Sequence, residues 1–274
     1  LLSVVALLFH GALGLNWRDP ARHEAWNQLA LWVMALQIAF CVFLNINRTS
    51  LHGFYRRRLA DAFLTPPSAA QPGHTLDGAL PLEKLADGGL VLPYLLVNTA
   101  VNLPDPVAQS LADRRGESFL LSPLAVGSEN TGLVDPKRYR YGGSALRLGT
   151  AIAISGAAVN SHVGNRLPAV ASALLTLFNV RLGYWLPNPS FLASTSRLKR
   201  FLLNYPVWPV YFLRELLGAF SKDSPRVFLS DGGHFENLGL YELVRRRCRF
   251  ILVGDAGADP EASFADLGNA IRLC

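Results

Sequence analysis

Residues 226–260 read RVFLSDGGHFENLGLYELVRRRCRFILVGDAGADP, and this stretch decides the predicted fold. The run Val227–Leu229 is short and apolar, which is typical of a buried strand, and it ends at the turn Ser230–Gly233. A helix is predicted from Asn237, a residue type favoured at N-caps, and a second buried strand is predicted at Phe250–Val253. Strand, helix and strand within this length predict a βαβ unit with a parallel pair of strands.

A carboxylate follows each of these predicted strands, Asp231 after the first and Asp255 after the second. In open parallel sheets, ligands bind beyond the carboxyl ends of the strands. Gly232 and Gly233 keep the turn after Asp231 free of side chains, so a substrate or a facing nucleophile can approach the carboxylate closely. A carboxylate placed there can take a proton from a serine hydroxyl, which predicts Asp231 as a catalytic residue.

The segment Ser230–Gly239, SDGGHFENLG, closely resembles the Asp-Gly-Gly element of the patatin-like phospholipases and of the related cytosolic phospholipases. More narrowly, it is similar to that of a group of bacterial, membrane-associated patatin-like proteins. The segment Ala153–Ala158, AISGAA, resembles the Ala/Ser-rich segment upstream of that element, and the resemblance extends over residues 45–272, including Asn47–Leu64.

The resemblance implies an α/β fold of three layers, α/β/α, with a largely parallel sheet. It also implies hydrolysis of acyl esters, as in phospholipases and lysophospholipases, on a Ser-Asp dyad. Asp231 is then the dyad carboxylate, and Gly232 and Gly233 shape the turn around it. The resemblance implies no calcium ion, and we expect neither a cofactor nor a metal.

The serine of the dyad is not matched in this chain. The family places it in a G-x-S-x-G elbow, and the sequence contains no such pattern: residues 142–146 and 153–157 come nearest and depart from it. We expect the nucleophile to lie before Leu1, so that the chain is a fragment that is inert by itself. Ser155 is the alternative nucleophile if Leu146–Ile154 is a strand followed by a helix. Otherwise Ser155 is a small residue that packs beneath the active-site loops.

Two apolar segments near the start predict a transmembrane helical hairpin over residues 1–45. Ala25–Leu44 is twenty residues long and carries no charge, which suits a span of the hydrocarbon core, and Leu1–Leu15 resembles the end of another span. Arginines at position 48 and at 56–58 favour a cytoplasmic exit. These observations predict an integral membrane protein, of the bacterial inner membrane by resemblance, with a cytoplasmic catalytic domain.

The rest of the chain divides into a basic juxtamembrane helix with a Pro/Gly-rich linker, 46–89, and the C-terminal part of the catalytic domain, 90–274. Apolar runs predict further elements in this part of the chain. They are strands at Leu92–Asn98, Ser118–Leu121 and Leu146–Ile154, and a core helix at Leu167–Phe178.

Composition excludes several classes of protein. Of 274 residues, 50% are hydrophobic and 17% are charged, which excludes a disordered or collagen-like chain. Cys41, Cys248 and Cys274 are too irregularly spaced for a disulfide framework or a C-x-x-C metal site. Basic residues are dispersed and no nucleic-acid motif occurs, which argues against nucleic-acid binding. The resemblance and the predicted spans imply other partners, namely a membrane phospholipid or other lipid ester as substrate and the membrane itself.

Two other functions stay open at this point. His234, Glu236 and Asp255 are of the residue types that bind divalent metals, which would suit a metal-dependent hydrolase. Without a serine, the protein is alternatively an inactive membrane-bound scaffold or lipid-binding protein, whose net charge of +6 favours anionic headgroups.

Overall fold

The computed structural model describes residues 28, 31–32, 35, 45–64, 78–86, 94–102, 116–141, 143–159, 175–176, 178–194, 196–204 and 207–274. The chain divides into two compact units. One comprises residues 1–45 with 207–211, and the other comprises 46–206 with 212–274. The sheet and the candidate site belong to the second unit.

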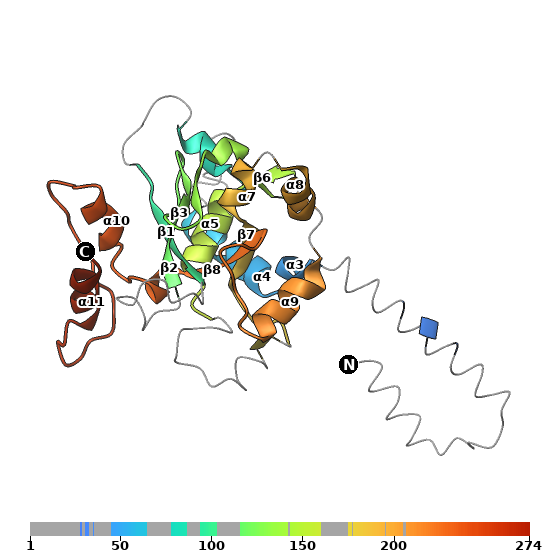
Figure 1. Ribbon diagram of the computed structural model, residues 1–274. Coiled ribbons are helices and arrows are strands. Elements are labelled where there is room, and N and C mark those ends of the chain that lie inside the picture. Colours follow the sequence, from blue (N-terminus) through green and yellow to red (C-terminus); the bar gives the residue numbers. More distant parts are fainter. Residues whose placement is uncertain are drawn as a thin grey trace, which may run out of the picture. The chain divides into compact units, whose positions relative to one another are not determined.

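Six strands form one antiparallel sheet, which curls into half of a barrel (Figure 1). Its strand order is β4-β3-β2-β1-β8-β7, and every neighbouring pair runs antiparallel. The strands are β1 (Val97–Asn102), β2 (Gly116–Leu121), β3 (Val126–Ser128), β4 (Gly132–Val134), β7 (Tyr184–Pro187) and β8 (Arg226–Asp231). A separate two-stranded ladder joins β5 (Arg140–Tyr141) to β6 (Ser144–Ala145).

The helices are short, and α5 packs against α4 and against strands β1 and β8 (Figure 1). The α-helices are α3 (Ile46–Thr49), α4 (His52–Phe63), α5 (Leu148–Ser155), α7 (Pro189–Ala193), α8 (Arg197–Asn204), α9 (Trp208–Leu216), α10 (Leu240–Arg245) and α11 (Ala265–Leu273). The 3-10 helices are η1 (Leu82–Ala86), η3 (Pro136–Arg138) and η4 (Gly232–His234).

Strand β8 is buried on both faces, which explains its continuous apolar sequence. Successive side chains of a strand point to opposite faces. Val227 and Leu229 belong to the main hydrophobic core, which includes the buried face of α5. Phe228 packs on the other face against Trp185 and Phe220, with ring centroids 5.2 and 5.3 Å away. Because side chains pack on both of its faces, strand β8 is held in place, and Asp231 lies at its end.

A buried ion pair lies on this aromatic side of the sheet. Arg181 Nε donates to Glu215 Oε1 at 3.0 Å, and each side chain is only 1% exposed. The indole N–H of Trp185 donates to Glu215 Oε2 at 3.1 Å, and Arg181 also donates to the carbonyl of Gly183 at 2.8 Å. The guanidinium lies 5.5 Å from the ring centroid of Phe228, so the pair is tied directly to β8.

The outer edge of β7 is occupied by a side chain. Asn47 in α3 donates from Nδ2 to the carbonyl of Trp185 at 2.9 Å, and its Oδ1 accepts the Trp185 N–H at 3.0 Å. One amide side chain therefore makes the two hydrogen bonds that a neighbouring strand would make with this residue.

The predicted three-layer, largely parallel patatin-like fold is wrong, because the sheet is antiparallel. Strand β8 lies between β1 and β7, so both of its edges are already paired. The run Phe250–Val253 consequently has no place beside β8. It forms no strand, and the side chains of Phe250 and Leu252 are 84% and 86% exposed. The expected βαβ unit is absent from residues 226–260.

Two local assignments also change. Leu146–Ile154, predicted as a strand, is largely helix α5, because an apolar run of this length suits a buried helix as well as a buried strand. Helix α10 begins at Leu240 rather than near Asn237, after Gly239 with a left-handed φ of 69°. Glu236, not Asn237, satisfies its N-terminus, since Glu236 Oε2 accepts the N–H of Tyr241 at 3.1 Å.

The two predicted spans, Leu1–Leu15 and Ala25–Leu44, lie outside the described residues apart from helical positions 28, 31–32 and 35. Among the residues that the structure does describe, none of the helices combines the length and the apolar character needed to cross a membrane. The expected integral membrane localisation is overturned by this finding. The predicted helix Leu167–Phe178 also lies mostly outside the described residues.

His52 near the start of α4 makes stability depend on pH. Burial lowers the pKa of this imidazole to about 4, and the charges of Arg56 and Arg181 act in the same direction, although the hydrogen bond to the Leu182 carbonyl raises it. In the unfolded chain its pKa is 6.5, so between these values only the unfolded state takes up the proton. We expect the unfolding free energy to fall by about 2 kcal/mol from pH 7 to pH 5 through this side chain.

Urea unfolding of the wild-type protein and of His52→Asn at both pH values measures this effect. The variant is expected to lose most of the pH difference, whatever its stability at pH 7. An equal difference in both proteins would assign the acid sensitivity to other groups.

Candidate active site

Strand β8 places Asp231 at the carboxyl end of a buried strand, as the sequence predicts. Residues 226–230 are buried and Asp231 is partly exposed. Thr99 of β1 is its cross-strand partner, so the carboxylate belongs to an inner strand, next to the edge strand β7. The sheet is antiparallel and not parallel as predicted, but Asp231 still lies where a buried strand reaches the surface.

The turn after Asp231 fixes one oxygen of the carboxylate. Asp231 Oδ1 accepts the N–H of Gly233 at 2.7 Å, and this bond caps the short helix η4. Among the described residues, it is the one hydrogen bond that the Asp231 carboxylate makes, and no ion pair involves this group. Its second oxygen therefore has acceptor capacity left for a hydroxyl group.

Gly232 has a steric role in this turn. It is buried, and a Cβ added to it would lie 2.6 Å from the carbonyl oxygen of Asn98 in β1. Real Cβ atoms do not approach backbone oxygens so closely, so a side chain here would push the turn away from β1. Gly233 is exposed, but a Cβ added to it would lie 2.7 Å from the Oδ1 atom of Asn237, so the Asn237 side chain packs against this part of the turn.

We expect Gly232→Ala to lower the unfolding free energy by about 1–3 kcal/mol, because the backbone must shift to accommodate the methyl group. Gly53→Ala in α4 is the matched control, since a Cβ there meets nothing within 4 Å and alanine favours a helix. Urea unfolding of both variants measures the difference. Equal stabilities would show that the close approach of Gly232 to Asn98 is unimportant.

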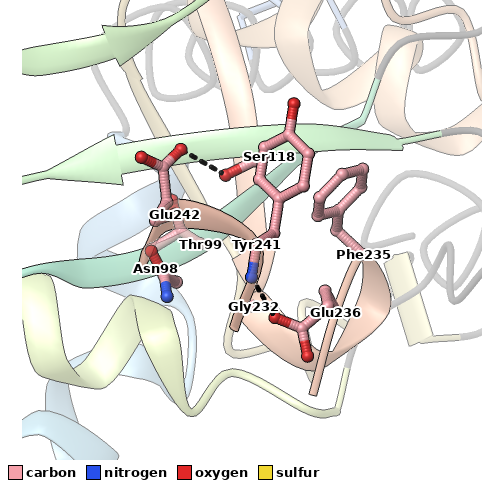
Figure 2. Close-up of a pocket in the computed structure, with 8 residues that line it drawn as sticks. All are labelled: Asn98, Thr99, Ser118, Gly232, Phe235, Glu236, Tyr241 and Glu242. Atoms are coloured by element: carbon pink, nitrogen blue, oxygen red, sulfur yellow. Dashed lines mark hydrogen bonds between the residues drawn. The ribbon is translucent and has the colours of Figure 1, made fainter. Parts of the chain in front are cut away.

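A small pocket lies beside Gly232, with room for about one water molecule (Figure 2). Residues of β1, β2 and the segment 232–242 line it, but Asp231 does not. The Oδ1 atom of Asn98 is buried in its wall and has no hydrogen-bond partner among the described residues. The pocket and the Asp231 carboxylate are therefore neighbours rather than a single cavity.

Both buried carboxylates that line this pocket already make hydrogen bonds or ion pairs within the protein. Glu236 accepts N–H groups at the start of α10. Glu242 accepts the Ser118 hydroxyl at 3.3 Å (Figure 2). It also pairs with Arg245 and Arg246. Glu242 was not predicted as a site residue, although it precedes two arginines by three and four residues, the helical spacing for such ion pairs.

Ser155, the alternative nucleophile, is the last residue of α5 and does not lie between a strand and a helix. Its hydroxyl donates to the carbonyl of Asn98 at 2.7 Å and makes no hydrogen bond with Asp231. The structure nevertheless brings the two regions together, because the same Asn98 oxygen contacts Gly232.

Tyr55 of α4 is near this site and was missed in the sequence. Its hydroxyl donates to the carbonyl of Gly156 at 2.8 Å. Burial raises the pKa of this phenol, and the negative charge of Asp231 raises it further. The sequence signal is weak, because Tyr55 is one of several aromatic residues beside a basic run.

The residues considered for a metal site do not come together. Asp255 is exposed and accepts the N–H of Gly257, and the His234 ring pairs with the Ser230 hydroxyl at 2.9 Å. Within the described part of the chain, no group of three or more His, Cys, Asp or Glu side chains is arranged to hold a metal ion. The metal-dependent alternative therefore loses its proposed ligand set of His234, Glu236 and Asp255.

Comparison of the chain with models of protein families, with curated proteins and with solved structures gave no match. The resemblance of residues 230–239 to the patatin-like element thus stays a prediction.

Proposed function

We propose that this chain supplies the carboxylate half of an acyl-ester hydrolase site, in which Asp231 is the general base for a serine nucleophile. The observation that carries the proposal is the state of the Asp231 carboxylate. One oxygen is oriented by the Gly233 N–H at 2.7 Å, and the other makes no hydrogen bond with any described residue. An oriented, partly exposed carboxylate with a free oxygen suits proton abstraction from a hydroxyl group.

The proposal rests on this local geometry and on the resemblance of residues 230–239, and not on the overall fold. Ser155 is a poor candidate for the nucleophile because its hydroxyl already donates to the Asn98 carbonyl. In the proposed site, the serine lies outside the described residues. The substrate class that the resemblance favours is a lipid ester.

The chemistry requires one proton to move twice in each half-reaction. Asp231 takes the hydroxyl proton as the serine oxygen bonds to the ester carbonyl carbon, and it returns that proton to the departing alcohol. Water then attacks the acyl-serine, passes its proton to Asp231, and the acid leaves as the serine is reprotonated. The Gly233 N–H is engaged by Asp231, so other donors must stabilise the oxyanion.

Labelling with a fluorophosphonate probe, which reacts with activated serines, tests this proposal. The protein in its natural length and the 274-residue chain are labelled, and the modified peptide is mapped by mass spectrometry. We expect one labelled serine other than Ser155 and loss of the label in Asp231→Asn. Labelling of Ser155, or no labelling in any sample, would overturn the proposed serine site.

A further inference from the structure

The phenol of Tyr55 is held against the end of α5. Its hydroxyl lies 2.8 Å from the Gly156 carbonyl oxygen, and a Cβ added at Gly156 would lie 2.7 Å from the same phenolic oxygen. Residue 156 therefore has to be glycine for the tyrosine to reach this position. Helices α4 and α5 are packed together, so the contact belongs to a larger interface.

Two further contacts lead from the end of α5 to the Asp231 turn. The Ser155 hydroxyl donates to the Asn98 carbonyl oxygen at 2.7 Å. A Cβ added at Gly232 would lie 2.6 Å from that same oxygen, so the carbonyl abuts the residue next to Asp231. The carbonyl of Asn98 is thus held by α5 on one side and supports the turn on the other.

From these contacts we infer that Tyr55 is a positioning residue of the proposed site: its hydroxyl fixes the end of α5, and through Ser155 and Asn98 it sets the place of Asp231. This inference rests on the proposed function and deepens it. The negative charge of Asp231 also raises the pKa of Tyr55, which indicates that the phenol and the carboxylate lie near one another.

A positioning role predicts a specific kinetic effect. Small displacements of a catalytic group lower the rate of the chemical step strongly while they leave substrate binding almost unchanged. Removal of the Tyr55 hydroxyl frees the end of α5, but the Gly156 carbonyl keeps a partner, because it also accepts the N–H of Ala158 at 2.9 Å. The loss of the hydroxyl should therefore cost little stability.

The kinetic test compares Tyr55→Phe with Tyr94→Phe in the protein of natural length. Tyr94 is the matched control, since its hydroxyl makes a hydrogen bond of 2.7 Å to Ser122. We expect Tyr55→Phe to lower kcat about tenfold with KM within about twofold of the wild-type value, and Tyr94→Phe to leave both nearly unchanged. An unchanged kcat in Tyr55→Phe would overturn the inference.

A second readout does not depend on hydrolysis. Fluorotyrosine is incorporated at position 55, and its ionisation is followed by fluorine NMR in the wild-type background, in Asp231→Asn and in Asp255→Asn. We expect the pKa of residue 55 to fall in Asp231→Asn alone. The same pKa in all three backgrounds would overturn the inference, even if the wild-type protein hydrolyses esters. Absence of hydrolysis with a shift in Asp231→Asn would instead count against the proposed function.

Discussion

Asp231→Asn is expected to lower kcat for ester hydrolysis by about two to four orders of magnitude. The amide is nearly the same size as the carboxylate, and its oxygen still accepts the Gly233 N–H that holds Asp231 Oδ1 at 2.7 Å. The turn and the fold should therefore persist, while the group that takes the serine proton is lost. Steady-state kinetics on a chromogenic ester, with thermal unfolding as the check on the fold, measures the effect.

Asp255→Asn is the matched control for this experiment. Asp255 accepts the N–H of Gly257 at 2.8 Å, which is the same local hydrogen bond that Asp231 makes with Gly233, and it follows an apolar run in the same way. We expect the control to keep wild-type activity. If both variants are as active as the wild-type protein, Asp231 is not the general base.

Arg181→Met is expected to lower the unfolding free energy by about 3–5 kcal/mol, because it removes a cation that pairs with the buried Glu215 carboxylate. Both side chains are 1% exposed, so water cannot replace the lost partner. Arg140→Met is the matched control: Arg140 pairs with Glu83 at 3.1 Å, but its side chain is 48% exposed, and such pairs contribute at most about 1 kcal/mol. Urea unfolding at pH 7 measures both variants.

A double variant separates the loss of a buried charge from the loss of packing. Arg181→Met combined with Glu215→Leu removes both charges, and we expect it to be more stable than Arg181→Met alone. The unfolding free energy should recover only in part, since Arg181 also donates to the carbonyl of Gly183 at 2.8 Å and this bond stays lost. A double variant less stable than the single variant would mean that Glu215 stabilises the fold through other contacts.

The sequence predicts the elements whose burial is evident from a short run and its flanking residues. Val227–Leu229 lies in β8, and Ser118–Leu121 lies in β2. Two predicted strands were wrong for a common reason, which is that pairing between strands depends on residues distant in the sequence. Leu146–Ile154 and Phe250–Val253 are both apolar, yet the first is mainly a buried helix. The second forms no strand and is largely exposed, since β1 and β7 already occupy the edges of β8.

The candidate site shows the same division between local and distant information. Asp231 and its two glycines are adjacent in sequence, so their turn could be recognised directly. Tyr55 is far from them in the chain, and only the packing of α4, α5 and β1 brings its hydroxyl into the same region. The Asn98 carbonyl, against which Gly232 packs, is a backbone atom and leaves no signature in the amino-acid sequence.

The side chain of Asn47 also bears on how this protein meets other polypeptides. Sheets that leave backbone amides unpaired at an edge invite strand addition by a second chain and, eventually, fibrillar aggregation. At Trp185 a second chain cannot pair in this way, because the backbone N–H and carbonyl are already hydrogen-bonded to the Asn47 side chain. Aspartate at position 47 would lack the donor, and leucine would lack both groups. A single asparagine thus blocks intermolecular β-pairing at Trp185.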